Sequence, residues 1–254
     1  MKITVLVEDS SDGTLQCEHG LSLYIESEYA NILFDTGQSD LFYKNAEKLG
    51  VDLSAVDFAV ISHGHYDHGG GLKKFLEINK TAPVYISRNA FGNFYNGEKY
   101  IGLDKSLKMN ERFILIQDNI KIGDGAEIFV SKGLESGVSS FGLTAEENGI
   151  KKSDTFLHEI YLCLETDGKK VLFSGCSHSG IEGIMRRFKP DIFIGGFHLI
   201  KVEDEKLLQK LAKVLSGYNT EYYTCHCTGQ RQYEYLKNHL KSLKYLSTGD
   251  TIIS

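Results

Sequence analysis

The sequence of 254 residues lacks several features that would assign a protein to a particular class. It contains two prolines and no tryptophan, and no low-complexity linker divides it. No segment reaches the roughly 18 apolar residues that span a bilayer. The first apolar stretch, in MKITVLVEDSSDG, is too short before its acidic residues to be a signal peptide. These absences argue against a membrane protein and against an exported one.

Positive charge is also scarce, because 34 acidic residues outnumber 28 basic ones and give a net charge of −6. Proteins that bind nucleic acid through its phosphates normally carry an excess of lysine and arginine. We therefore expect a small-molecule substrate, and neither a nucleic acid nor a membrane as partner. The sequence does not indicate an oligomeric state.

The five cysteines are odd in number and show no tight framework spacing. Disulfide-stapled proteins usually carry paired cysteines at regular spacings, so reduced thiols in a cytoplasm are the simpler interpretation. Hydrophobic residues make up 41% of the chain, which is enough for a sizeable buried core.

Short apolar runs bounded by Gly, Asp, Asn or Ser recur along the chain and predict strands. They occupy residues 3–7, 21–25, 32–34, 58–61, 84–86, 113–116, 128–130, 160–164, 171–173, 192–194, 222–224 and 252–253. Amphipathic stretches predict helices at residues 41–49, 72–78, 181–188, 207–215 and 232–240. The pattern favours one α/β domain over residues 1–254, with sheets packed face to face and helices outside.

Two long stretches, residues 88–110 and 131–155, show no clear periodicity and are expected to be irregular cover loops. The first contains aromatic residues that either stack on a flat ring or simply pack the loop down, and basic residues suited to a phosphate. These are Phe91, Phe94, Tyr95 and Tyr100, and Arg88, Lys99, Lys105 and Lys108.

The most informative segment is ISHGHYDHGGGL at residues 61–72, which ends a predicted strand. Residues i and i+2 of an extended chain point the same way, so His63 and His65 can bind one ion together. Asp67 and His68 follow after the chain turns and can serve a second ion, while the three glycines let the backbone pass close by. Imidazole and carboxylate together suit one or two zinc ions, and also manganese or iron. A histidine-rich loop that binds no metal is the alternative, and the ordered spacing argues against it.

SHGHYDHGGGL resembles the HxHxDH signature of the metallo-β-lactamase superfamily, and ILFDTG at residues 32–37 resembles that family's first motif. There the aspartate, here Asp35, supports the metal loop. HGLSLYIE, FSGCSHSGI, IGGFHL and CHCTG resemble the branch named for 7,8-dihydropterin-6-yl-methyl-4-(β-D-ribofuranosyl)aminobenzene-5′-phosphate synthase. The resemblance implies a four-layer αβ/βα sandwich of the metallo-β-lactamase type, with metals at one edge between two sheets.

The resemblance also indicates further metal ligands. His226, after a predicted strand, matches the family's last metal histidine, although a strand-end histidine can also bond to backbone. His178 and His158 are both candidates for the third histidine of the first ion, and they do not exclude each other. Cys176 stands where the family has a bridging aspartate. It can ligate as a thiolate or be a small buried hydrophobe.

Four other residues near these candidate ligands have weaker or different predicted roles. His198 resembles an active-site histidine of phosphodiesterase relatives that does not bind metal, so it is a candidate general acid or oxyanion contact; helix capping is the alternative. His19 is a weaker candidate for the same rim. Cys225 and Cys227 are disfavoured as ligands, because alternation along a strand would point both away from His226.

Together these features predict a hydrolase in which water bound to a metal ion attacks a small ester-type molecule. Asp67 would orient that water and His198 would face the leaving group, and phosphorylated or aromatic molecules are candidate substrates. Two alternatives stay open. One is condensation or lyase chemistry, as the branch name implies, and the other is a metal-binding domain without catalysis. A redox di-iron centre is disfavoured, since glutamate would be expected where His65 stands.

Overall fold

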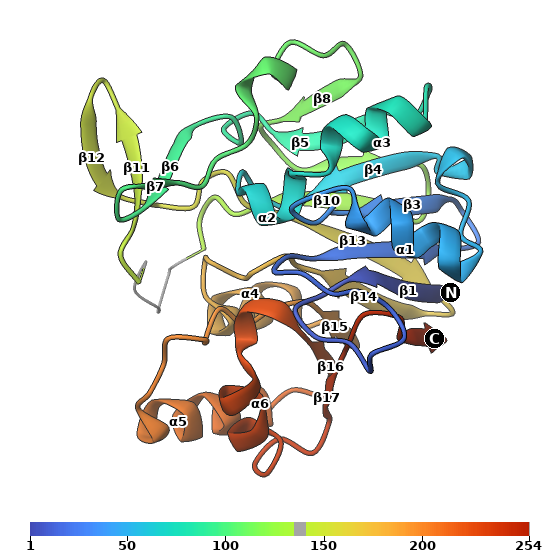
Figure 1. Cartoon of the computed structure of the whole chain (residues 1–254). Coiled ribbons are helices and arrows are strands. Elements are labelled where there is room, and N and C mark those ends of the chain that lie inside the picture. The colour runs from blue at the N-terminus through green and yellow to red at the C-terminus, as the bar shows by residue number, and fades with distance from the viewer. Residues whose placement is uncertain (135–140, 254) are drawn as a thin grey trace.

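The computed structural model of the chain describes residues 1–134 and 141–253, whose strands form two large sheets and one small one (Figure 1). The first large sheet has seven strands. In order across the sheet they are β18 (Thr251–Ile253), β1 (Lys2–Val7), β2 (Ser22–Glu26), β3 (Asn31–Phe34), β4 (Phe58–Ile61), β5 (Val84–Ser87) and β8 (Phe113–Ile116). The half from β18 to β3 is antiparallel, and the half from β3 to β8 is parallel.

The second large sheet also has seven strands and repeats this division. Its order is β17 (Leu243–Tyr245), β16 (Glu221–Thr224), β15 (Ile192–Ile194), β14 (Lys169–Phe173), β13 (Ile160–Thr166), β10 (Ala126–Val130) and β9 (Ile120–Ile122). The strands from β14 to β17 are parallel, and those from β9 to β14 are antiparallel.

The main core lies between the two sheets. Phe34 of β3 and Phe173 of β14 meet there, with ring centroids 5.9 Å apart. Their neighbours Leu33 and Leu172 point to the opposite faces, because successive side chains of a strand alternate. All four side chains are buried, so each sheet is covered on both faces.

Helices supply the outer layers. They are α1 (Leu41–Leu49), α2 (Tyr66–Gly69), α3 (Leu72–Ile78), α4 (Ile181–Phe188), α5 (Glu205–Leu215) and α6 (Gln230–Leu236), with short 3₁₀ turns at Leu53–Ala55, Lys105–Leu107 and His226–Thr228. α1 and α3 cover the first sheet, and α4, α5 and α6 cover the second (Figure 1). In α5, Leu208, Leu211, Ala212 and Leu215 form the buried stripe that a 3.6-residue period produces. The four-layer αβ/βα sandwich is therefore confirmed.

The helix boundaries differ from the predicted ones at two places. α5 begins earlier, at Glu205, because the Asp204 side chain caps the helix by accepting a hydrogen bond from the Lys206 amide. The helix predicted over residues 232–240 is α6, which begins earlier, at Gln230, and ends at Leu236, so His239 lies in the turn beyond it and is exposed.

The prediction of irregular cover loops is wrong for much of residues 88–110 and 131–155. The first contains β6 (Asn93–Asn96) and β7 (Lys99–Tyr100), and the second contains β11 (Leu143–Glu147) and β12 (Ile150–Ser153). These strands pair in the order β12-β11-β6-β7 as a small sheet at one end of the molecule (Figure 1). Because β6 pairs with a strand from a distant segment, neither stretch shows the pairing on its own. Residues 135–140 of the second predicted loop lie outside the described residues.

No helix in residues 1–134 or 141–253 is both long and apolar enough to cross a membrane.

Candidate metal centre

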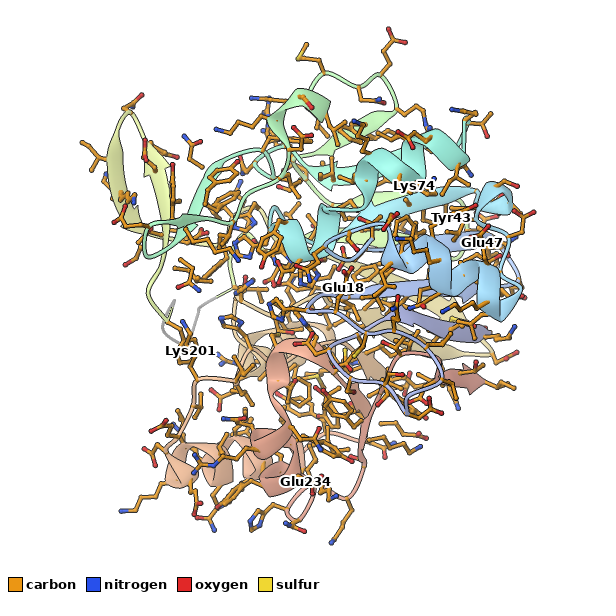
Figure 2. The ribbon with its side chains drawn as sticks, viewed as in Figure 1. Glu18, Tyr43, Glu47, Lys74, Lys201 and Glu234 are labelled. Carbon is orange, nitrogen blue, oxygen red and sulfur yellow. The ribbon has the colours of Figure 1, made fainter. Side chains whose placement is uncertain are left out.

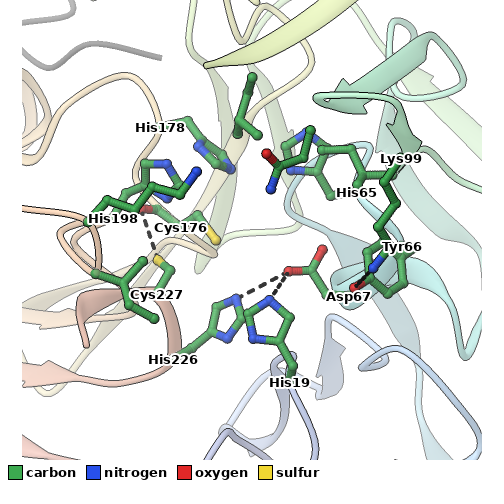
Figure 3. Close-up of a pocket in the computed structure, with 15 residues that line it drawn as sticks. His19, His65, Tyr66, Asp67, Lys99, Cys176, His178, His198, His226 and Cys227 are labelled. Carbon is green, nitrogen blue, oxygen red and sulfur yellow. Dashed lines mark hydrogen bonds and ion pairs between the residues drawn. The ribbon is translucent and has the colours of Figure 1, made fainter. Parts of the chain in front are cut away.

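The predicted site residues gather at one edge of the sandwich, because the carboxyl ends of parallel strands in one sheet meet at the same edge. In the first sheet Asp35 follows β3 and His63 follows β4; in the second, Cys176 and His178 follow β14, His198 follows β15 and His226 follows β16. Side chains from both halves of the chain therefore face one another across the sandwich (Figure 3).

Asp35 organises the metal loop through buried hydrogen bonds. Its Oδ1 accepts from the Ser62 amide at 2.7 Å, and its Oδ2 accepts from the Ser62 hydroxyl and from His68 Nδ1, each at 2.7 Å. Since the single hydroxyl proton of Ser62 goes to Asp35, Ser62 Oγ must accept from His63 Nδ1 at 2.9 Å. Neutral His63 and His68 therefore carry their protons on Nδ1, and their Nε2 lone pairs face the site.

The first group of donors, called here the histidine set, consists of His63, His65 and His178. One ring nitrogen from each lies within 4.8 Å of the others, and His63 Nε2 is 3.3 Å from His178 Nε2. Burial lowers the pKa of all three, to about 3 for His65, so they face one another as neutral imidazoles. His65 Nε2 is buried without a hydrogen-bond partner. A shared cation would satisfy such converging lone pairs.

The second group, called here the aspartate set, consists of Asp67, His68 and His226. His68 Nε2 lies 3.2 Å from His226 Nε2, and Asp67 Oδ2 lies 3.4 Å from His226 Nε2 and 3.8 Å from His68 Nε2. Donor atoms around a tetrahedral ion with bonds of about 2.1 Å lie about 3.4 Å apart. The spacing of the aspartate set therefore fits one small cation.

His226 is oriented by Asp9, which sequence reasoning did not identify. Asp9 Oδ1 lies 2.5 Å from His226 Nδ1, and Asp9 Oδ2 lies 2.8 Å from Nδ1 of His19. Burial opposes protonation of His226, but its hydrogen bonds to Asp67 and Asp9 raise its pKa well above the ordinary value. Hydrogen bonds to the same two carboxylates raise the pKa of His19 to about 9. The two carboxylates therefore favour a positive charge on both rings, whether a proton or a metal ion supplies it.

Cys176 lies between the two sets. Its Sγ is 3.2 Å from His68 Nε2 and lies within 4.8 Å of the ring nitrogens of His63 and His68. Burial raises the pKa of this thiol well above its usual range, which favours an S–H group that donates to His68. Cys176 therefore lies where a ligand would lie. Burial favours the form of His63 that can bind a metal, the neutral imidazole, but at Cys176 it disfavours the thiolate that would bind one.

His158 lies beside the histidine set with both ring nitrogens engaged by protein partners. Its Nδ1 accepts from the Gly64 amide at 3.0 Å, and its Nε2 is 3.0 Å from Asp154 Oδ2. No lone pair remains for an ion, so this geometry does not support the predicted ligation by His158. Its contacts instead hold the backbone between His63 and His65.

His198 and Cys227 occupy the side of the site formed by the second sheet. The His198 ring centroid is 4.2 Å from that of His178, and its Nδ1 is buried without a hydrogen-bond partner. The expectation that Cys225 and Cys227 both point away from the site is wrong for Cys227. Cys225 is in the core between the sheets, but a 3₁₀ turn interrupts the strand alternation, and Cys227 lines the cavity.

The donor sets open into a cavity of about 250 Å³ (Figure 3). Fifteen residues line it: His19, His65, Tyr66, Asp67, Asn96, Lys99, Ile101, Leu143, Cys176, His178, His198, Ile200, Lys201, His226 and Cys227. Lys99 reaches it from the small sheet and donates to the Tyr66 hydroxyl at 3.0 Å. Lys201 lies between the small sheet and α5, and donates to the Phe141 carbonyl at 3.2 Å (Figure 2).

Most of the predicted ring- and phosphate-binding residues do not line this cavity. Of the basic group only Lys99 does so, while Arg88 bonds to Gln117 and Lys105 to Asn93. None of the four predicted aromatic residues lines it. Phe91 and Phe94 are buried, so the interpretation that the aromatic residues pack the segment down is the better one for these two.

The fold and the histidine and aspartate side chains that converge at its edge now define the class of protein. The chain belongs to the metallo-β-lactamase superfamily, whose family model matches residues 15–218.

Three relatives show which branch of the superfamily it resembles. It is 30% identical over 260 residues to 7,8-dihydropterin-6-methyl-4-(beta-D-ribofuranosyl)-aminobenzene-5′-phosphate synthase of Methanocaldococcus jannaschii, covering 90% of this chain and 88% of the relative. It is 29% identical over 238 residues to the uncharacterised protein MJ0448 of the same organism, covering 89% and 90%. Among solved structures, Tm1679, described as a metal-dependent hydrolase of the beta-lactamase superfamily, has a TM-score of 0.87 and 34% identity, covering 100% of this chain and 99% of that one. The predicted family and branch are confirmed.

Proposed function

We propose that this protein is a metal-dependent hydrolase that acts on a small ester-type molecule with an anionic group. The observation that carries the proposal is the convergence of the histidine set and the aspartate set on one cavity. The donor atoms face one another at spacings suited to a cation: His63 Nε2 is 3.3 Å from His178 Nε2, and His68 Nε2 is 3.2 Å from His226 Nε2. Membership of the superfamily and the likeness to Tm1679 support the same assignment.

A divalent ion held by these donors would lower the pKa of water towards neutrality and polarise an oxygen of the substrate. Zinc suits the mixture of imidazole, carboxylate and one thiol best, at one or two ions per chain, and manganese or iron also suit imidazole and carboxylate. The chain supplies the rest of the chemistry. Asp67 projects into the cavity and would orient the attacking water, and His198 would donate a proton to the leaving group (Figure 3).

The substrate class follows from the cavity. About 250 Å³ accommodates a compact molecule, and its two lysines, Lys99 and Lys201, can neutralise one phosphate or carboxylate. The net charge of −6 opposes long polyanions, so nucleic acid is not proposed as a partner, and no membrane partner is proposed. All five cysteines are free, in agreement with a protein of the cytoplasm.

A second candidate function is condensation or lyase chemistry, favoured by the 30% identical relative that is named as a synthase. The same metal-facing cavity could polarise an electrophile for either reaction. A turnover panel of the zinc-loaded protein separates the two: aryl phosphodiesters, lactones, thioesters, pterin conjugates and a structured RNA. Hydrolysis of a small ester supports the main proposal. Product formation only from a pterin precursor and a ribosylated arene would replace it with the synthase, and efficient RNA cleavage would contradict the substrate class.

A further inference from the structure

We propose that His19 is a further metal ligand and joins the aspartate set as its fourth protein donor. This inference rests on the proposed function, because it concerns the same metal centre. Neither the signature motif nor the other strand-end residues indicate it, since His19 lies in the loop between β1 and β2, on the N-terminal side of the whole signature.

The position of the ring supports ligation. His19 Nε2 lies 3.3 Å from Asp67 Oδ2, and His226 Nε2 lies 3.4 Å from the same oxygen. The two ring centroids are 4.6 Å apart, and both rings point at the Asp67 carboxylate (Figure 3). His19 therefore has the same relation to Asp67 as the predicted ligand His226 has, at a spacing expected for donors on one ion.

The same carboxylate orients both rings. Asp9 accepts from Nδ1 of His226 through one oxygen and from Nδ1 of His19 through the other. In metal sites a ligating histidine almost always donates its second ring N–H to such a partner, which fixes the tautomer. With Nδ1 protonated, the Nε2 of His19 faces a carboxylate oxygen and must carry a proton or a metal ion. A surface histidine that met Asp67 by chance would not need the support of Asp9.

The backbone also holds His19 at this place. A Cβ at Gly20 would lie 2.4 Å from the Asp67 carbonyl oxygen, so only glycine permits this approach, and the Leu21 amide donates to that oxygen at 3.2 Å. On the other side, the Glu18 carboxylate accepts from the amide and hydroxyl of Ser39 at 3.1 and 2.7 Å. The loop is thus fixed to the metal loop on one side of His19 and to the start of α1 on the other.

The assignment gives the two sets different roles. Zinc sites with four protein donors are typically closed and structural, whereas catalytic sites have three protein donors and an open position. With His19 the aspartate set has four donors, and the histidine set keeps three. The ion that acts on the substrate would therefore be the one in the histidine set, and the aspartate set would hold a supporting ion.

The test measures metal binding rather than activity. The full-length protein, His19→Gln and the matched control His239→Gln are stripped with a chelator and titrated with Co²⁺ and with Zn²⁺. His239 is exposed, and its ring packs against that of Tyr235 with the two centroids 5.0 Å apart. We expect two ions in the wild type and in the control. In His19→Gln one of the two should bind at least about tenfold more weakly, with a changed visible Co²⁺ spectrum for that ion alone.

The outcomes separate the two proposals. Equal affinities for both ions in His19→Gln and wild type would overturn the role of His19 and leave the hydrolase proposal intact. If the wild type bound a single ion and His19→Gln bound it with the same affinity, the role of His19 would likewise be overturned and the hydrolase proposal would stand. A wild type that binds no ion would overturn both proposals. Circular dichroism of the stripped proteins checks that the substitution leaves the fold unchanged.

Discussion

Two carboxylates set the protonation of the metal-facing imidazoles. Asp35 accepts a hydrogen bond from His68 Nδ1 and one from the Ser62 hydroxyl, whose oxygen accepts in turn from His63 Nδ1. Asp9 accepts a hydrogen bond from His226 Nδ1. Each histidine then presents Nε2 to the site. In metalloproteins such carboxylate–histidine hydrogen bonds fix the tautomer of the ligand and tune its basicity, and these pairs would do the same for a bound ion.

The first prediction concerns His65, whose Nε2 is buried without a partner. His65→Ala should remove one ion and lower turnover at least about 100-fold, because a ligand of the histidine set is lost. Circular dichroism should stay unchanged, since the cores on either side of the sheets do not include His65. Elemental analysis and steady-state kinetics check this, with His239→Ala as control. A fully active His65→Ala protein would show that the ligand assignment is wrong.

The second prediction ranks two neighbours. His178→Ala should lose more metal than Cys176→Ser, because His178 offers a neutral imidazole whereas burial favours the protonated thiol at Cys176. Metal stoichiometry of the two variants after identical dialysis decides the order. A larger loss in Cys176→Ser would make the thiolate a principal ligand and reverse the ranking.

The sequence predicts the candidate ligands of the metal loop residue by residue because they are neighbours along the chain. Asp9 could not be found in this way, since its contact with His226 joins residues 217 positions apart. His158 illustrates the reverse problem. Its spacing from Cys176 resembles a ligand motif, yet the turn geometry directs its lone pair to the Gly64 amide.

Among the structural elements, those with strong local periodicity were predicted closely. α1, α3 and α4 have the predicted bounds, because their apolar positions recur with a helical period. In the small sheet only the pairing of β6 with β11 depends on contacts that local patterns do not contain, whereas the hairpins β6–β7 and β11–β12 are local and their strands were not predicted. The small sheet bears on the proposed function because two of its residues, Asn96 and Lys99, line the cavity.

The third prediction concerns how closely the metal loop packs on β6 and the residues just before it. A Cβ at Gly64 would lie 2.2 Å from the Ala90 carbonyl oxygen and 2.7 Å from the Phe94 ring. Gly64→Ala should therefore lower the free energy of unfolding by about 1–3 kcal/mol, as overpacking does, and weaken metal binding by displacing His63 and His65. Chemical denaturation measures the first effect. Gly217→Ala, whose Cβ would meet its nearest atom at 3.2 Å, is the control. Equal stability of the two variants would contradict the packing described.

At the scale of the whole molecule, the family resemblance supplied the four-layer architecture, while local patterns alone led only to sheets packed face to face with helices outside. Of the aromatic residues in residues 88–110 that could either bind a ring or pack the segment down, Phe91 and Phe94 are buried by packing. The two lysines that line the cavity, Lys99 and Lys201, come from distant parts of the chain.

The fourth prediction follows from these two lysines. Lys99→Met and Lys201→Met should each raise KM for an anionic ester about tenfold, because a charge-assisted hydrogen bond is lost, and leave KM for a neutral lactone unchanged. Lys105→Met is the control, since Lys105 bonds to Asn93 and does not line the cavity. Equal changes for charged and neutral substrates would remove the anion site from the proposal and leave the metal chemistry.

The most direct test of the central claim is the metal content of the purified protein, measured by elemental analysis before and after reconstitution with zinc, manganese and iron. The convergence of the histidine set and the aspartate set predicts one to two transition-metal ions per chain, reduced in His65→Ala and retained in His239→Ala. Absence of any transition metal from the wild type, even after reconstitution, would contradict the account.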